Sequence, residues 1–321
     1  MNGRRVLVTG GAGFIGSHVA EAHVRRGDRV WVVDDLSTGK RANLPAGAQF
    51  VHLSINDPGL DDVFRAAGGF DLVNHHAAQI DVRMSVEDPR RDARINIDGF
   101  LNVAECARRH GTRRILFVSS GGVVYGEPEL RPTPEGEPKL PRSPYGVTKL
   151  AAEQYLFYYA TVHGQEYVAV RYSNVYGPRQ DPHGEAGVVA IFCSRLLAGA
   201  PITIFGDGEQ TRDYVYVGDV VAANLLLADQ PLAPPTTLDA RAFNVGTGVA
   251  TSVNGLADAL LRAKGSSVER RHAPARPGEL QHSCLDASRL RSLGWAPAVT
   301  LEQGLAATYD FIAAREREAT A

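Results

Sequence analysis

Residues 6–17 read VLVTGGAGFIGS, an apolar strand followed by a glycine at every third position and the start of a helical pattern that extends to Arg26. Without side chains, Gly10, Gly13 and Gly16 allow a tight turn and let the backbone approach a pyrophosphate closely. The N-terminus of the following helix adds N–H donors and a favourable dipole for an anion. The stretch therefore predicts a strand–turn–helix unit that binds a dinucleotide.

A carboxylate follows the second predicted strand. Val30–Val33 forms that strand, and Asp34 ends it about 20 residues after the turn, which is the spacing of the dinucleotide fingerprint. A carboxylate at this point accepts hydrogen bonds from the adenosine ribose and repels a 2′-phosphate, which favours NAD over NADP. The alternative interpretation is a structural glycine turn with Asp34 on the surface.

Strands and helices alternate through the first half of the chain. Asp71–Asn74 and Arg114–Val118 have the pattern of strands, and Ile97–His110 that of the helix between them. Such alternation predicts an α/β fold, a Rossmann-type doubly wound parallel sheet with helices on both faces. Ligands of such sheets bind at the carboxyl ends of the strands.

Two polar loops divide the rest of the chain. Residues 126–144 are rich in proline, glycine and glutamate, and residues 177–187 form a second loop. We expect an NAD-binding domain over residues 1–175. We expect a smaller C-terminal α/β substrate-binding domain over residues 176–321, with some of its segments crossing back to the first.

Composition excludes several classes of partner. The 321 residues carry a formal net charge of −2, so no nucleic-acid partner is expected. The spacing of Cys106, Cys193 and Cys284 fits neither a disulfide framework nor a zinc site, which indicates a reducing, cytoplasmic setting. No stretch has the length of a signal-peptide core or a membrane span. His75-His76 resembles a metal pair, but adjacent strand residues face opposite ways, and we expect no metal and His76 near the glycine turn.

The second motif is Tyr145-x-x-x-Lys149, at the start of a helix that we expect to extend through Tyr159. A spacing of four places both side chains on one helix face. A free tyrosine titrates near pH 10, and a nearby ammonium favours its phenolate, which can serve as a base. A surface pair is the alternative, but the motif follows a strand that ends in Ser119-Ser120, whose hydroxyls suit a substrate oxygen.

These motifs resemble those of the UDP-galactose (UDP-glucose) 4-epimerases in the extended short-chain dehydrogenase/reductase family. The resemblance extends over nearly the whole chain and is carried in order by Thr9–Ser17, Asp34–Leu36, His75–Ala78, Asn96–Gly99, Ser119–Gly126, Tyr145–Lys149, Arg171–Asn174, Arg212–Tyr214 and Arg276–Glu279.

The resemblance implies an enzyme that retains NAD⁺ and inverts C4 of a UDP-hexose. Tyr145 would remove the proton of the 4-hydroxyl, Lys149 would hold the nicotinamide ribose, and the 4-keto sugar would turn over before it is reduced again. The cofactor residues it implies are Gly10, Gly13, Phe14, Ile15, Gly16, Asp34, Asp35, Leu36, Ser37, Thr38, Gly39, Ser54, Ile55, His76, Ala77, Ala78, Gln79, Asn96, Val118, Tyr145, Lys149 and Tyr172. The substrate residues it implies are Asn174, Val188, Arg212, Arg276, Glu279 and Ser283. It also implies a homodimer formed through the helices that begin near Asn96 and Tyr145.

Residues 119–126 are one residue longer than the usual family pattern. The catalytic hydroxyl can therefore belong to Ser119 or Ser120, or its position can fall on Gly121, which has none; Ser120 is our prediction. Gly121-Gly122 also stands where 4,6-dehydratases have an Asp-Glu pair for proton transfer, which argues against that reaction.

Three other positions depart from the family. Ser54 stands where an aspartate often contacts adenine, and Ile80 where some epimerases have a lysine near the NAD phosphates. Ser283 is small at a position that is bulky in epimerases restricted to glucose and galactose, so we expect room for an N-acetyl group.

Related reactions share these motifs. UDP-glucuronate 4-epimerase, UDP-N-acetylglucosamine 4-epimerase and CDP-sugar 2-epimerase remain alternatives. A non-catalytic NAD-sensing protein is a more remote one, because such proteins characteristically lose the Tyr/Lys pair that this sequence has.

Overall fold

The computed structural model describes residues 3–182, 187–275 and 280–320. The chain forms two compact units. The first comprises Met1–Gly126, Pro138–Arg171 and Val221–Phe243, and the second comprises Glu127–Glu137, Tyr172–Val220 and Asn244–Ala321. The chain thus passes between the units several times, and a division near residue 175 stays a prediction.

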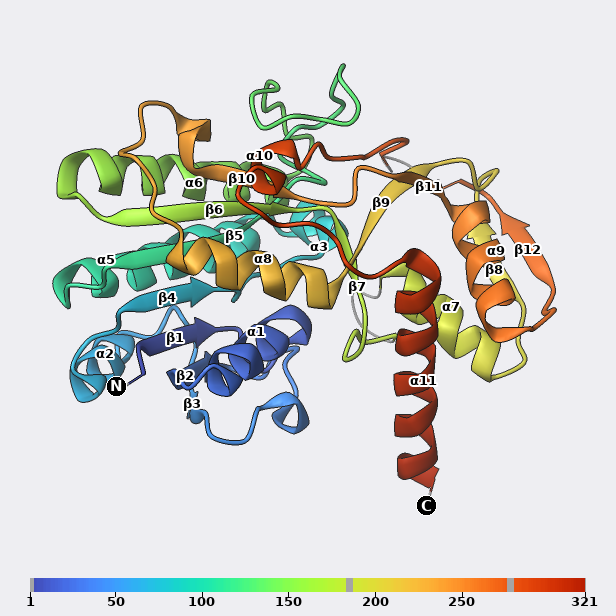
Figure 1. The fold of residues 1–321 in the computed structure, drawn as a ribbon, viewed down its shortest axis with the longest axis horizontal. Helices are drawn as coiled ribbons and strands as arrows, with labels where there is room; N and C mark the ends of the chain where they lie inside the picture. The colour runs from blue at the N-terminus through green and yellow to red at the C-terminus, as the bar shows by residue number, and fades with distance from the viewer. Residues whose placement is uncertain (1–2, 183–186, 276–279, 321) are drawn as a thin grey trace. The chain divides into compact units, whose positions relative to one another are not determined.

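A seven-stranded sheet organises the first unit, in the order β10-β6-β5-β4-β1-β2-β3 (Figure 1). Its strands are β1 (Arg5–Thr9), β2 (Arg29–Asp34), β3 (Gln49–His52), β4 (Leu72–His75), β5 (Arg114–Ser120), β6 (Glu166–Tyr172) and β10 (Ala242–Val245). β1 pairs in parallel with both β2 and β4. The chain builds outward from β1 to β3 and then returns to β4, so the strand order reverses between β1 and β4. In such sheets a dinucleotide binds at this reversal, and the Rossmann-type prediction is confirmed.

Helices cover this sheet. They are α1 (Phe14–Arg25), α2 (Leu60–Ala67), α3 (Val82–Glu87), α4 (Pro89–Ala93), α5 (Phe100–Arg109), α6 (Pro144–His163) and α8 (Val217–Asp229). A π-helical turn, Arg94–Gly99, joins α4 to α5. The helix predicted from Ile97 to His110 is therefore π-helical at its start. The helix predicted over Tyr145–Tyr159 begins one residue earlier, because Pro144 suits a first helical position, and it ends four residues later before Gly164.

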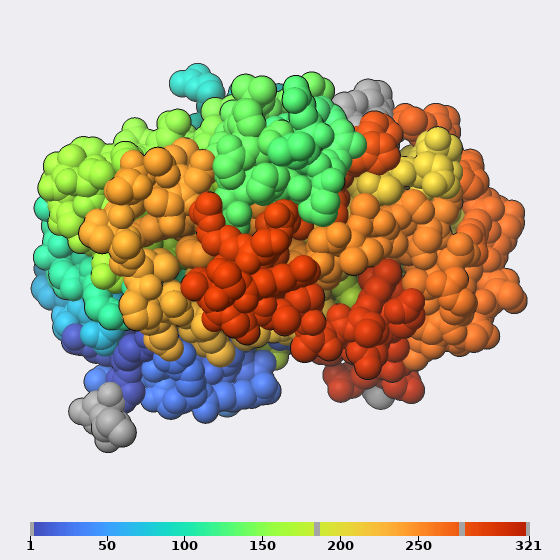
Figure 2. All heavy atoms as spheres, turned by 45° about the horizontal axis from the view of Figure 1, so that its top comes forward, coloured from blue at the N-terminus to red at the C-terminus, as the bar shows by residue number. Residues whose placement is uncertain are grey.

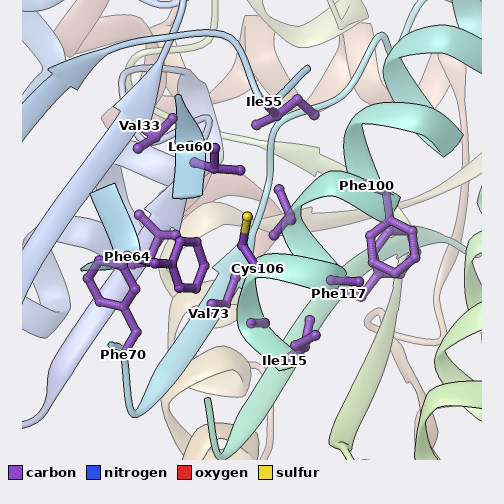
Figure 3. Close-up of a cluster of buried hydrophobic side chains, with 14 of the residues drawn as sticks. Val33, Ile55, Leu60, Phe64, Phe70, Val73, Phe100, Cys106, Ile115 and Phe117 are labelled. Atoms are coloured by element: carbon purple, nitrogen blue, oxygen red, sulfur yellow. The ribbon is translucent and has the colours of Figure 1, made fainter. Parts of the chain in front are cut away.

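One hydrophobic core of the first unit lies between the sheet and helices α2, α5 and α6 (Figure 3). Alternate strand residues such as Leu7, Val73 and Phe117 point into it, because successive side chains of a strand face opposite sides. Phe100 of α5 packs edge to face on Phe117, with ring centroids 5.1 Å apart. Each such fully buried side chain contributes about 1.5–3 kcal/mol of transfer free energy, and together they hold the strand ends in register.

The second unit contains two small sheets, β11-β9-β7 and β12-β8. Its strands are β7 (Asn174–Tyr176), β8 (Ile202–Phe205), β9 (Thr211–Tyr216), β11 (Ala250–Ser252) and β12 (Arg270–Ala273). Its helices are α7 (Val188–Leu197), α9 (Val253–Lys264), α10 (Ser288–Arg291) and α11 (Leu301–Thr320). The apolar faces of α7, α9 and α11 pack together in one core.

The chain between β5 and α6 is irregular, as predicted, and it contributes to the green surface in Figure 2. Within the described ranges, no helix combines the length and the apolar character that crossing a membrane requires.

Candidate active site

The glycine turn between β1 and α1 has no room for side chains. A Cβ atom on Gly10, whose φ is +67°, would lie 2.6 Å from the amide nitrogen of Ala77. One on Gly16 would lie 2.3 Å from the carbonyl oxygen of Gly10, and one on Gly13 would lie 3.2 Å from the same oxygen. Gly13 is also the N-cap of α1 and has no side chain to cover the amides of the first turn. The turn therefore leaves backbone donors for a pyrophosphate.

Asp34 lies at the carboxyl end of β2, beside this turn. Its carboxylate accepts hydrogen bonds from the backbone N–H of Ala12 at 2.9 Å and of Leu36 at 2.8 Å. Burial raises its pKa, and the two backbone donors oppose that shift. A Cβ on Gly39 would lie 2.6 Å from this carboxylate, so the glycine keeps the space beside it open. This cradle and acceptor fit a dinucleotide with a free ribose.

The loop after Asp34 is held in a constrained conformation. Leu36 has a φ of +58°, which is uncommon for a residue other than glycine. Asp35 accepts from the backbone N–H of Ser37 at 3.0 Å. Asp35, Leu36 and Ser37 are predicted cofactor residues, and with Thr38 they directly follow β2.

Two histidines, one buried and one partly buried, border the other side of the turn. His75 bonds through Nδ1 to the hydroxyl of Thr9 at 2.8 Å, and its ring stacks on Phe117. His76 is partly buried, and its buried Nε2 atom has no hydrogen-bond partner among the described residues. Burial lowers the pKa of His76 to about 3 and that of His75 well below its usual range, so both rings are neutral.

Tyr145 and Lys149 lie one turn apart near the start of α6. The Lys149 ammonium donates to the carbonyl oxygen of Val118 in β5 at 2.9 Å. It lies 5.0 Å from the ring centroid of Phe117 and 5.7 Å from that of Tyr145, within range of a cation–π interaction. Burial lowers the pKa of Lys149 to about 8, and the charges of Asp92 and Glu153 oppose that shift.

The two serines at the end of β5 differ in their surroundings. Ser119 is buried and donates to the carboxylate of Glu153. Ser120 is partly exposed, and no described residue bonds its hydroxyl. Ser120 therefore has a hydroxyl available to a ligand, whereas that of Ser119 is engaged in the protein interior.

A polar cluster joins the end of β4 to α6. Asn96 accepts from the backbone N–H of Gln79 at 2.9 Å and donates to the carbonyl oxygen of Gln79 at 2.9 Å. Asp92 accepts from the side chains of Gln79 at 2.9 Å, Asn96 at 3.0 Å and Thr148 at 2.8 Å. The single proton of the Thr148 hydroxyl is shared with the carbonyl oxygen of Tyr145, which lies 3.0 Å away. The predicted residues Gln79 and Asn96 are thus tied to the helix that carries the Tyr/Lys pair.

Two further predicted cofactor residues follow β3. Ser54 accepts from the backbone N–H of Asn56 at 3.3 Å. Ile55 is buried, and its carbonyl oxygen accepts from Asn102 at 2.8 Å. Ile80 is exposed, at 52%.

The predicted substrate residues belong to the second unit, as does Tyr172, which is buried at the end of β6. Arg212 lies on β9, and its guanidinium donates to the carbonyl oxygen of Thr211 at 2.9 Å. Ser283 is buried and bonds through its backbone N–H to the same carbonyl oxygen at 3.1 Å. Asn174 is exposed on β7, which pairs with β9.

The structure therefore brings Arg212 and Ser283 together at the first residue of β9. Val188 begins α7 and packs against the core of the second unit. Arg276 and Glu279 lie outside the described residues. No cluster of metal-ligating side chains occurs in the described ranges.

Sequence reasoning missed the buried charges around the Tyr/Lys pair. Arg171 donates to Glu153 through Nε at 3.0 Å and through Nη2 at 2.6 Å, and also to Asp239 at 2.8 Å. Glu153 follows Lys149 by four residues, a spacing that could have indicated a shared helix face. Asp92 had no comparable sequence signal, because its partners come from separate segments.

Comparison with known proteins agrees with this geometry. Residues 6–246 match the model of the NAD dependent epimerase/dehydratase family. The chain is 45% identical to UDP-glucose 4-epimerase of Mycolicibacterium smegmatis over 313 residues, 96% of this chain and 98% of that protein.

Two solved structures are also similar. The UDP-glucose 4-epimerase of Thermotoga maritima, solved with UDP-glucose, has a TM-score of 0.92 and 45% identity over 97% of this chain and 99% of that chain. The UDP-glucose 4-epimerase of Thermus thermophilus, in complex with NAD, has a TM-score of 0.89 and 44% identity over 96% of this chain and 99% of that chain. The glycine cradle, the Asp34 acceptor and the Tyr145/Lys149 pair thus lie in a member of a known enzyme family: the chain belongs to the NAD dependent epimerase/dehydratase family.

Proposed function

We propose that this protein is a UDP-hexose 4-epimerase that interconverts UDP-glucose and UDP-galactose. The observation that carries the proposal is the arrangement at the end of β5. Lys149 is bonded to Val118, Tyr145 lies on the same helix face, and the hydroxyl of Ser120 is not engaged by any described residue. The similarity to enzymes of this name supports the choice of substrate.

The glycine turn, Asp34 and the residues from Ala77 to Gln79 would hold NAD, together with Asn96 and Lys149. When bound, NAD⁺ supplies a hydride acceptor for C4 of the sugar and a donor for the return transfer. Retention of the cofactor between the two transfers would depend on this turn, in which Gly11 and Gly16 are buried and Gly10 and Gly13 are partly exposed.

Side chains of the protein carry out the proton transfers. Tyr145 as phenolate takes the proton of the sugar 4-hydroxyl, and the Lys149 ammonium stabilises that phenolate. Ser120 donates to the 4-oxygen as it changes between hydroxyl and carbonyl. When the 4-keto sugar is reduced from its other face, Tyr145 returns the proton. This general acid–base catalysis contributes about 10²–10⁴-fold to the rate.

Arg212, Asn174 and Val188 would contact the UDP group, with Arg276 and Glu279. An arginine suits a diphosphate because its forked donors bind two oxygens at once. The small side chain of Ser283 would admit an N-acetyl group at C2, so the proposal includes UDP-N-acetylhexosamines as further substrates.

We also propose that the protein is a homodimer in the cytoplasm. Exposed apolar residues recur on one face of α6, at Val147, Tyr155, Tyr158 and Val162. Their spacing of three, four or eight residues forms a stripe that a second copy could cover. The three cysteines are buried and free, which suits a reducing compartment. The mass in solution, measured by light scattering, tests the dimer.

A substrate panel tests the reaction. Protein with NAD⁺ is incubated with UDP-glucose, UDP-galactose, UDP-N-acetylglucosamine and UDP-glucuronate, and the products are resolved by chromatography and proton NMR. Interconversion of a C4 pair without net NADH, abolished in Tyr145→Phe, supports the proposal. No conversion in any of the four would refute it and direct attention to another headgroup or to a non-catalytic role.

A further inference from the structure

Asp92 is a fully buried carboxylate that the reaction above does not use. Its oxygens accept from three neutral groups, the amides of Gln79 and Asn96 and the hydroxyl of Thr148. No cationic group among the described residues bonds it. Three donors and no acceptor suit an ionised carboxylate, so a buried negative charge lies here without a bonded counter-charge.

These bonds tie together the segments around the Tyr/Lys pair. Asp92 belongs to α4, Asn96 to the π-helical turn and Gln79 to the chain after β4. Thr148 is in the first turns of α6, three residues after Tyr145 and one before Lys149. π-helical turns interrupt regular helix geometry and often occur at functional sites. Here the interruption can place the side chain of Asn96 within reach of both Asp92 and Thr148.

Among the described residues, Lys149 is the cation whose charge Asp92 can stabilise. The ammonium is buried, and its one hydrogen bond in the described ranges goes to the neutral carbonyl of Val118. Two carboxylates favour its charged form, Asp92 more than Glu153. Glu153 is already paired with Arg171, so much of its charge is offset, whereas that of Asp92 is not.

The other titratable groups near Lys149 do not replace Asp92. His75 ends β4 and His76 follows it. Both are neutral, because burial lowers the pKa of each. Tyr145 is the group whose phenolate the ammonium has to stabilise.

We propose that Asp92 is a positioning residue for the proposed epimerisation: its buried charge keeps the Lys149 ammonium protonated, and its bond to Thr148 fixes the turn of α6 that carries Tyr145 and Lys149. It acts through Lys149 and does not contact the substrate. The inference rests on the proposed function for its catalytic consequence, but the charge coupling can be measured without turnover.

Asp92→Asn is a nearly isosteric test. One amide oxygen still accepts from Gln79 and Asn96, and the amide nitrogen can donate to the Thr148 hydroxyl in place of the lost acceptor. The substitution thus removes the charge and keeps the contacts. Glu87→Gln is the matched control, because it removes one negative charge from an exposed position of the neighbouring helix α3.

Lysine NMR measures the coupling directly. The sequence has only four lysines, Lys40, Lys139, Lys149 and Lys264. In protein labelled with ¹³C-lysine, the signal that disappears in Lys149→Met is that of Lys149, and its titration gives the pKa in protein free of NAD. We expect a midpoint near the value of about 8 in the wild type and in Glu87→Gln. In Asp92→Asn it falls by about one unit; a fall of less than about 0.3 unit would overturn the inference.

Turnover gives the second readout. At pH 8, a fall of about one unit in the pKa of Lys149 leaves roughly a fifth as much ammonium, so kcat falls about fivefold. At pH 6 kcat stays near that of the wild type. If the wild type turns over no nucleotide sugar, the proposed function fails while the NMR shift still decides the coupling.

Failure of Asp92→Asn to fold is also informative. The double variant Asp92→Asn/Lys149→Met then decides, because it removes the cation that the charge of Asp92 serves. Folding of the double variant supports the coupling. If the double variant does not fold either, Asp92 supports the fold independently of Lys149 and the inference is wrong.

Discussion

The hydroxyl of Ser119 donates a hydrogen bond to the carboxylate of Glu153. The same carboxylate accepts hydrogen bonds from Nε and Nη2 of Arg171, so Ser119 is part of a buried ionic network. The next residue, Ser120, points its hydroxyl to no described residue. Adjacent residues of one strand end thus have separate tasks, the first in holding the strand and the second, we propose, in binding the sugar.

We expect opposite effects from alanine at these two serines. Ser120→Ala removes a donor to the sugar oxygen and lowers kcat about 10²-fold, with the free energy of unfolding changed by less than about 0.5 kcal/mol. Ser119→Ala removes a buried bond and costs about 1–2 kcal/mol of stability, with a smaller loss of kcat. Steady-state kinetics and urea unfolding measure both. The reverse pattern would assign the catalytic hydroxyl to Ser119.

The buried charge of Lys149 is predicted to lower the free energy of unfolding. Its pKa falls from 10.5 to about 8 on folding, so the folded state disfavours the charge. Lys149→Met keeps the volume and should raise the free energy of unfolding at pH 7 by about 1–3 kcal/mol while abolishing turnover.

The contribution of Lys149 to the free energy of unfolding depends on pH with a defined sign. Between about pH 8 and 10.5 the unfolded chain binds more protons at Lys149 than the folded one, so this residue's contribution to stability rises with pH. Urea unfolding between pH 8 and 10 should show this rise in the wild type, and Lys149→Met should lack it. An equal rise in both proteins would contradict the assignment.

His76 should make the fold sensitive to acid. Its pKa is lowered from 6.5 to about 3, so the unfolded chain binds a proton that the folded one does not. Stability from this residue is therefore lost as pH falls from 6.5 towards 3, by about 1.4 kcal/mol per pH unit. His76→Leu should reduce the slope of unfolding free energy against pH by that amount, whereas His163→Gln, at an exposed position, should leave it unchanged.

Asp34 is expected to select the cofactor. Asp34→Ser removes the ribose acceptor and the charge that repels a 2′-phosphate, so NAD should bind at least about tenfold more weakly and the preference over NADP should shrink. Calorimetric titration with both cofactors measures the change. Asp57→Ser serves as the comparison, because that carboxylate is exposed, accepts from the Gly59 amide and has no predicted cofactor role. Equal losses in the two variants would contradict a specific role for Asp34.

Ser283 is predicted to set tolerance for the sugar substituent. Ser283→Tyr fills space beside Thr211 and should lower turnover of UDP-N-acetylglucosamine at least about tenfold, while UDP-glucose turnover changes much less. Turnover of both substrates by the two proteins decides it, with UDP-glucose as the internal control for folding. Equal rates with UDP-N-acetylglucosamine in wild type and variant would refute the prediction.

The sequence by itself determined the features that depend on local spacing. The glycine turn with Asp34 predicted the NAD cradle, because a strand, a turn and a helix are contiguous and glycine is the residue that such backbone requires. The Tyr145/Lys149 pair followed from the four-residue spacing of one helix face. The alternation of strands and helices predicted the doubly wound parallel sheet, which is confirmed, whereas the order of its strands came from the structure.

Only the tertiary structure decided which groups share the interior with that pair. Asp92 meets Thr148 across 56 positions, and Glu153 meets Arg171 across 18. The different surroundings of Ser119 and Ser120 also appear only when β5 packs against α6. Periodicity tells which way a side chain faces, but partners from distant segments depend on how the helices pack on the sheet, and burial then sets the charge of each group.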